Sequence, residues 1–226
     1  MISPSAILAR DGNAAQAPAL LGVKYFPGAA APAAPYAGAM QLLSHPELEA
    51  HRDAIVLQAE HEGLPPVLVA AIVMVESSGE TYAFRPEPYY RWLWDVRRSE
   101  PFRLTGKDVV GKAAPKDFPS MYGSRDAEWW GQQASWGLMQ VMGAVARERG
   151  LDPRIPLTVL CDPTYGLSFG CAHLAALRDR NLAEHGWVGV VAAYNAGSVR
   201  HDRDGGLVNQ VYVDKVSTLI NLERLP

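Results

Sequence analysis

The sequence has neither a long apolar run nor a block of basic residues, and these two absences exclude whole classes of function. Its longest apolar stretch is too short to span a bilayer, so we expect no transmembrane segment. The net charge is −3, and no cluster of Lys and Arg is long enough to bind nucleic acid or a membrane surface. What remains is the ordinary composition of a soluble globular chain, with 48% hydrophobic and 20% charged residues.

Cysteine is equally scarce, and the two cysteines do not form a metal-binding pattern. Cys161 and Cys171 are not spaced as C-x-x-C. A helix predicted to open at Pro163 carries Cys171 about 12 Å along its axis, beyond the ~7 Å Cα separation that a disulfide tolerates. We therefore expect two free, buried thiols, and we expect neither a metal nor a cofactor.

The first part of the chain differs in composition from the rest. Residues 13–40 are rich in Ala, Pro and Gly and carry few charges, which is typical of a linker. We therefore expect an extended arm over residues 1–43 and one folded domain over residues 44–226. Residues 1–10 lack a basic start followed by an apolar core, so no signal peptide is expected.

Apolar residues recur at helical spacing over most of the predicted domain. Ser44-His45-Pro46-Glu47 fits a capping box, which predicts a first helix over residues 44–63. Pro65-Pro66 suits the start of a second helix over residues 65–78, joined to the first by a short turn. Further helices are predicted over residues 141–149, 163–180 (with Asp162 as N-cap), 187–195 and 209–222.

Glu76 stands at the end of the second predicted helix, where a carboxylate is poorly placed. An almost entirely aliphatic run ends there in Glu76-Ser77-Ser78-Gly79, and the glycine suits a C-terminal cap. The helix dipole disfavours negative charge at that end, and the face that carries Glu76 is apolar. Both effects raise a carboxyl pKa, as a general acid near neutral pH requires. From this segment alone, a Glu76 that merely ends the helix in water fits equally well.

Three short motifs carry most of the polar groups that could form a site: Glu76-Ser77-Ser78-Gly79, Gly137-Leu138-Met139-Gln140 and Ala193-Tyr194-Asn195-Ala196-Gly197. In this order and spacing the sequence resembles the soluble lytic transglycosylase family. Two flanking segments are similar to the family as well, Gly63-Leu64-Pro65-Pro66 and Tyr212-Val213-Asp214-Lys215-Val216. The resemblance covers residues 44–222. It implies a mainly α, lysozyme-like helical domain with a small irregular or β insertion, which acts on strands of bacterial peptidoglycan.

The resemblance also implies a role for Glu76. It would protonate the oxygen of the β-1,4 bond between N-acetylmuramic acid and N-acetylglucosamine, while the N-acetyl group assists at the anomeric carbon. As a carboxylate it would then take the C6 hydroxyl proton, which closes a 1,6-anhydro ring without water and makes the reaction that of a lyase. Ordinary glycosidases use two carboxylates. The motifs here supply one, which fits the lyase reaction.

Six further residues are candidates for binding the glycan: Ser135, Met139, Gln140, Tyr194, Asn195 and Tyr212. Amides such as Gln140 and Asn195 can bind hydroxyl or acetamido groups, and the two tyrosines can hydrogen-bond near the glutamate. Met139 can form an apolar wall for a sugar ring. Structural alternatives compete with these roles, because Met139 can be core, Asn195 a helix cap and Ser135 a small residue for close packing.

The connection between the first two motifs is longer than in the family's compact form. Residues 80–135 lose helical periodicity and gather aromatic residues, which predicts an irregular lobe or a small sheet. Its rings can grip a glycan, but we expect most of them to pack as a satellite core. Its acids, if placed ~6.5–9.5 Å from Glu76, would give an inverting muramidase instead of a lyase. They are Glu87, Asp95, Asp108, Asp117, Asp126 and Glu128.

Three functions therefore remain in order of preference: a lytic transglycosylase, a hydrolytic muramidase and an inactive glycan-binding module. The substrate implies action at the bacterial cell wall. Without a recognisable signal peptide, we expect the protein to reach the periplasm by a specialised route, or the wall through phage or secretion machinery. The sequence does not indicate an oligomeric state.

Overall fold

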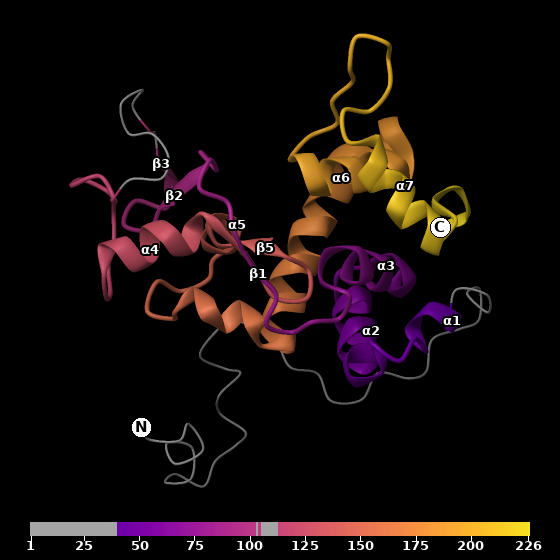
Figure 1. Cartoon of the computed structure of the whole chain (residues 1–226), viewed down its shortest axis with the longest axis horizontal. Coiled ribbons are helices and arrows are strands. Elements are labelled where there is room, and N and C mark those ends of the chain that lie inside the picture. The colour runs from indigo at the N-terminus through magenta and orange to yellow at the C-terminus, as the bar shows by residue number, and fades with distance from the viewer. Residues whose placement is uncertain (1–39, 103, 105–112) are drawn as a thin grey trace, which may run out of the picture. The chain divides into compact units, whose positions relative to one another are not determined.

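The computed structural model describes residues 40–102, 104 and 113–226 (Figure 1). Most of its core residues lie in helices. The expected arm over residues 1–43 lies outside the described residues except for its last four. These form a short helix, α1 (Met40–Leu43), in which Leu43 is fully buried. The described helices and small antiparallel strands confirm a mainly α, lysozyme-like domain with a small β insertion.

The first long helix begins later than its sequence predicts. Backbone turns and a 3-10 turn (Glu49–His51) precede α2 (Arg52–His61), whose N-cap makes no side-chain hydrogen bond. The predicted helix start at Ser44 is therefore wrong. The turns instead bury Leu48 completely beside Leu43, and this burial outweighs the local capping preference.

The glutamate helix, α3 (Pro66–Ser77), agrees with its prediction within one residue at each end. Pro65 is the N-cap, and the first helical position is the second proline. At the other end Ser78, with φ of 53°, takes the left-handed cap in place of the expected glycine. The side chains of residues 67–73 are all fully buried, so α3 is the central helix of the core.

The two helices predicted over residues 163–180 and 187–195 form one nearly continuous element, α6 (Pro163–Ala196). A non-helical break at Gly186 divides it. The predicted cap is confirmed, because Asp162 Oδ1 accepts hydrogen bonds from the backbone N–H groups of Thr164 and Tyr165. In the described part of the chain, no helix is both long and apolar enough to cross a membrane.

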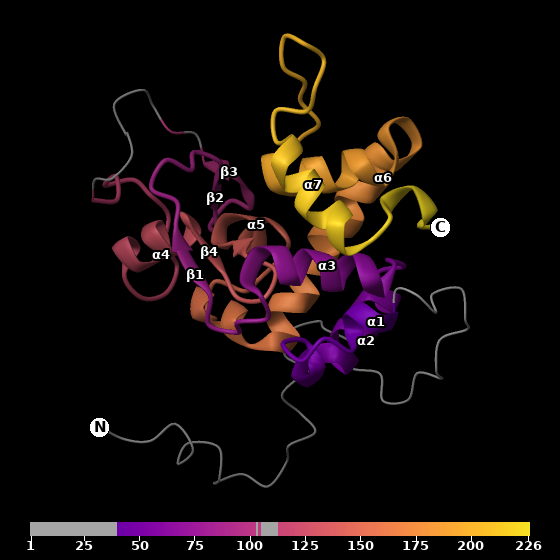
Figure 2. The same ribbon diagram turned by 45° about the vertical axis from the view of Figure 1, so that its right-hand side comes forward.

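The C-terminal elements are α7 (Gln210–Leu219) and a 3-10 turn (Leu222–Arg224), with a further 3-10 turn (Leu157–Cys161) before α6. In Figures 1 and 2, α7 lies beside α6 and above α3. Both cysteines are free thiols as expected, although only Cys171 is fully buried.

The insertion contains two small sheets and a helix that the sequence reading missed. β1 (Phe84–Pro86), β4 (Ala134–Trp136) and β5 (Val141–Met142) pair antiparallel in the order β1-β4-β5. β2 (Leu93–Asp95) and β3 (Glu100–Phe102) form a separate hairpin. The missed helix is α4 (Arg125–Gln132), and the helix predicted over residues 141–149 is shortened to α5 (Gly143–Glu148) because β5 precedes it.

A second, smaller core holds the insertion together. Phe118 lies at its centre and makes edge-to-face contacts with Phe102 and Trp129, with ring centroids 5.0 Å apart in both cases. The expectation that most insertion aromatics pack in this way is wrong. Six of the eleven aromatic side chains over residues 80–135 are exposed, namely Tyr82, Phe84, Tyr89, Trp92, Tyr122 and Trp130.

A buried ion pair joins α4 to α5. Arg147 donates from Nε and Nη2 to the two oxygens of Glu128, at 2.8 Å in each case. Its remaining hydrogen bonds go to the carbonyls of Leu151, Asp152 and Ile155, and Gln132 also donates to Glu128. Because every partner in this network is hydrogen-bonded, the pair fixes the insertion helix without leaving a buried charge uncompensated.

Gly137 begins the segment that connects the insertion to the core. Its φ is +69°, and a Cβ atom at this position would lie 2.1 Å from the carbonyl oxygen of Leu160. Glycine is therefore required here both by the backbone conformation and by the close approach of the 3-10 turn Leu157–Cys161.

We expect Gly137→Ala to destabilise the protein more than Gly123→Ala. Both positions have positive φ, 69° and 74°, so both variants incur about 1 kcal/mol of left-handed strain. Only at Gly137 must backbone also move, because nothing lies within 4 Å of the new methyl group at Gly123. Overpacking of this kind adds about 1–3 kcal/mol. Urea unfolding measures the difference, and equal losses in the two variants would contradict the close approach.

Candidate active site

The site begins with the carboxyl group of Glu76 in the last turn of α3. Its Oε1 accepts a hydrogen bond of 2.7 Å from the hydroxyl of Tyr212, which projects from α7. Two of the sequence-predicted residues thus meet, although 136 positions separate them. The phenol of Tyr212 holds one carboxyl oxygen; within the described residues no hydrogen bond is made to the other, so it is available to a ligand.

Burial is the main influence on this carboxyl group and raises the pKa of Glu76 above its ordinary value of 4.5. The hydrogen bond from Tyr212 and the charges of Arg85 and Lys215 lower it, whereas the charge of Glu87 raises it further. Such a group stays protonated at higher pH than an exposed glutamate. It can therefore donate a proton to a leaving oxygen.

Gln140 lies in the loop after Gly137 and uses its whole amide within the protein. Its Oε1 accepts a hydrogen bond from the Ser135 hydroxyl at 2.9 Å. Its Nε2 donates to the carbonyls of Ala83 at 3.0 Å and Gly137 at 3.1 Å. Ser135 is only 2% exposed. The geometry therefore favours Gln140 and Ser135 as residues that fix the loop.

The same loop contacts the ends of two core helices. The carbonyl of Leu138 accepts a hydrogen bond of 2.8 Å from the Ser77 hydroxyl, next to Glu76. The carbonyl of Met139 accepts one of 2.7 Å from the hydroxyl of Tyr194 on α6. The Met139 side chain is fully buried, so it belongs to the core and cannot form a wall for a sugar ring.

Asn195 is exposed and offers hydrogen-bonding groups to solvent. Its Oδ1 accepts a hydrogen bond of 3.0 Å from Asn209, which also donates to the carbonyl of Ala192 at 2.9 Å. Asn209 was missed by sequence reasoning because it lies outside the three motifs. The pair connects the end of α6 to the start of α7, so Asn195 and Tyr212 are held by the same junction.

Three charged residues act on the pKa of Glu76, namely Arg85, Glu87 and Lys215. Glu87 is one of the insertion acids considered from the sequence, whereas Arg85 and Lys215 were missed because nothing in the sequence separates them from ordinary surface charge. His173 packs behind Tyr194 with ring centroids 5.7 Å apart, and burial lowers the pKa of His173 to about 4. It is therefore neutral near pH 7 and adds no positive charge there.

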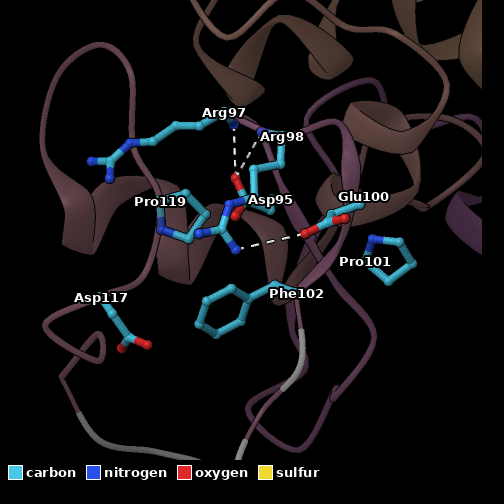
Figure 3. A pocket seen from close by; sticks show the side chains of 8 residues that line it. All are labelled: Asp95, Arg97, Arg98, Glu100, Pro101, Phe102, Asp117 and Pro119. Atoms are coloured by element: carbon cyan, nitrogen blue, oxygen red, sulfur yellow. Dashed lines mark hydrogen bonds and ion pairs between the residues drawn. The ribbon is translucent and has the colours of Figure 1, made fainter.

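Three of the six insertion acids accept hydrogen bonds from partners other than the predicted site residues. Asp95 accepts hydrogen bonds from the backbone N–H groups of Arg97 and Arg98, as Figure 3 shows. Asp117 lines the same cavity, of about 440 Å³, which contains none of the predicted site residues. Asp126 accepts from the backbone of Ala114, and Glu128 is paired with Arg147. Asp108 lies outside the described residues.

The described residues offer no obvious place for a metal ion. Over residues 40–102, 104 and 113–226, no group of three or more His, Cys, Asp and Glu side chains is close enough to bind one.

Comparison with known proteins agrees with the arrangement of the motifs. A family model described as the transglycosylase SLT domain matches residues 53–214. The match contains Glu76, the loop after Gly137, both asparagines and Tyr212. Searches of curated proteins and of solved structures returned no significant match.

We expect Glu76→Gln to raise the melting temperature at neutral pH. Because the folded pKa is raised, the folded state keeps a proton that the unfolded chain loses above about pH 4.5. Stability is therefore lost as pH rises from 4.5 through the folded pKa. The amide does not titrate and can still accept the Tyr212 hydrogen bond. Melting curves from pH ~4 to pH ~8 should show that the difference in melting temperature between Glu76→Gln and wild type grows with pH. A difference that stays constant would contradict the raised pKa of Glu76.

Proposed function

The chain belongs to the transglycosylase SLT domain family, and we propose that it is a peptidoglycan lytic transglycosylase with Glu76 as its single general acid and base. The family assignment supports a lytic transglycosylase activity on peptidoglycan. Our proposal adds the bond, the product and the residues. The bond is the β-1,4 linkage between N-acetylmuramic acid and N-acetylglucosamine, and the product carries a 1,6-anhydro ring. Its place of action is the bacterial cell wall.

The observation that carries the proposal is the partly buried Glu76 carboxyl held by Tyr212 at 2.7 Å. In its protonated form, Glu76 donates to the glycosidic oxygen as the bond to the anomeric carbon breaks. The acetamido group of the same sugar assists at that carbon. The C6 hydroxyl oxygen then bonds to the anomeric carbon, and Glu76 takes the hydroxyl proton. Tyr212 stabilises the carboxylate between the two steps.

The remaining residues divide into two proposed roles. Asn195 is exposed beside the junction of α6 and α7, so it is suited to bind the glycan directly. Ser135, Gln140 and Tyr194 are engaged with backbone or one another, so they position the loop that lies against Ser77 and Glu76. Their proposed contribution to glycan binding is to fix the loop that holds Ser77, next to Glu76. A partly buried carboxyl group with a raised pKa favours an acid catalyst over an inactive glycan-binding module.

Hydrolysis remains a second candidate for one specific reason. The charge of Glu87 acts on Glu76, so this insertion acid is electrostatically coupled to the site. A second carboxylate that activates water would convert the lyase into a muramidase. Asp95, Asp126 and Glu128 are less suitable, because each already accepts hydrogen bonds within the insertion.

Glu76→Gln should lower activity on purified sacculi by about 10²-fold or more, the usual contribution of general acid–base catalysis. Glu80→Gln makes the same chemical change at an exposed residue four positions away and serves as the control. Turbidity loss of sacculi measures both variants. If the Glu76 variant retained most of its activity while the fold stayed intact, Glu76 could not be the acid.

Digestion in ¹⁸O-labelled water should give unlabelled muropeptides that end in 1,6-anhydro-N-acetylmuramic acid. The reason is that the attacking oxygen comes from the sugar itself, so no water enters the product. Mass spectrometry of the released muropeptides distinguishes the two chemistries. Label in most of the new reducing ends would replace the lyase reaction with hydrolysis, while Glu76 would remain the acid.

A further inference from the structure

Arg85 and Glu87 form an ion pair beside the proposed active site. The distance from Arg85 Nε to Glu87 Oε1 is 2.6 Å. Alternate residues of an extended segment point to the same side, so the two side chains share one side of β1 and its continuation. The Arg85 side chain is 64% exposed and that of Glu87 is 36% exposed. The pair is therefore accessible to water and to a ligand.

The backbone beneath this pair is fixed to β4. Arg85 stands opposite Ser135 in the strand register, and its carbonyl accepts a hydrogen bond from the Ser135 hydroxyl at 3.4 Å. The N–H of Glu87 donates to the carbonyl of Gln133 at 2.6 Å. Since Ser135 also binds Gln140, the pair is carried by the same framework that holds the loop beside Glu76.

Both members of the pair influence Glu76, in opposite directions. The positive charge of Arg85 lowers the pKa of Glu76, and the negative charge of Glu87 raises it. Glu87 is thus an insertion acid that is both coupled to Glu76 and partly exposed to water. In the structure, a guanidinium N–H lies against one of its oxygens.

We propose that Arg85 biases the reaction product toward the anhydro ring by holding Glu87 in the ion pair. While Glu87 is paired, water near the anomeric carbon has no second carboxylate to activate it, and attack by the C6 hydroxyl is favoured. This inference rests on the lytic transglycosylase reaction proposed above. It makes Arg85 a specificity-determining residue that limits how often Glu87 is available as a base.

The two routes differ only in the attacking oxygen and in the group that takes its proton. In both, the bond between the anomeric carbon and the leaving oxygen breaks, and Glu76 protonates that oxygen. In the lyase route the C6 oxygen bonds to the anomeric carbon, and its proton returns to Glu76. In hydrolysis a water oxygen forms that bond, its proton passes to Glu87, and both carboxyl groups re-equilibrate with solvent.

The strength of the ion pair sets the size of the expected effect. Partly exposed ion pairs are weak. Removing Arg85 should therefore raise the fraction of molecules with an unpaired Glu87 only a few-fold. We expect Arg85→Met to raise the ratio of ¹⁸O-labelled reducing ends to anhydro ends about two- to fivefold. The ratio does not depend on the overall rate, so a slower variant is still informative.

The experiment compares wild type, Arg85→Met, Glu87→Gln and the double variant on purified sacculi in ¹⁸O-labelled water. The control is Arg98→Met, which removes a similarly exposed arginine from the ion pair with Glu100 on the β2–β3 hairpin. Circular dichroism verifies that each variant is folded. Mass spectrometry gives the ratio of labelled to anhydro ends for each.

The expected pattern is a raised ratio in Arg85→Met and a wild-type ratio in Glu87→Gln, the double variant and the control. An unchanged ratio in Arg85→Met would overturn the proposal, as would a raised ratio that persists in the double variant. The products of the wild-type enzyme test the underlying lyase reaction separately. If it already gave mainly labelled ends, the lyase reaction would fail, and so would the role of Arg85, because the pair would not be excluding hydrolysis.

Discussion

The arrangement around Glu76 depends on one side-chain amide, that of Gln140. Its three hydrogen bonds join the residue before β1, strand β4 and the start of its own loop. The loop in turn presents the carbonyls of Leu138 and Met139 to Ser77 and Tyr194. Gln140 has φ of 47°, a conformation that costs a non-glycine residue about 1–3 kcal/mol. It persists because the surrounding hydrogen bonds leave the backbone no alternative.

The position of Glu76 in α3 is unfavourable for stability but suited to the proposed acid catalysis. A carboxyl group at the C-terminal end of a helix, on a largely apolar face, disfavours its own ionised form. The rest of α3 offsets this, since every side chain over residues 67–73 is fully buried. Each fully buried large aliphatic side chain contributes about 1.5–3 kcal/mol. The helix therefore tolerates an unfavourable acid at its last turn, and the raised pKa of Glu76 favours the protonated form that a leaving group requires.

Local signals predicted the starts of α3 and α6 and the position of Glu76 in the last turn of α3. The Pro65-Pro66 start, the Asp162 cap and the apolar run before the glutamate all act within a few residues, so the sequence expresses them directly. The roles of Gln140 and Met139 could not be predicted in this way. An amide that binds a carbonyl 57 positions away looks the same in a sequence as one that binds a sugar. The coupling of Arg85 and Glu87 to Glu76 depends equally on a strand pairing that short motifs do not encode.

The hydrogen bond between Glu76 and Tyr212 has a consequence for the order of folding. Its partners are separated by 136 residues, so it closes one of the longest loops in the domain. Contacts of high sequence separation form late, because the entropy of loop closure must be overcome before they contribute. A chain in which α3 and its neighbours have assembled but α7 has not docked carries its acid without the phenol. During synthesis from the N-terminus, the Glu76 site is therefore completed only after α7 has been synthesised.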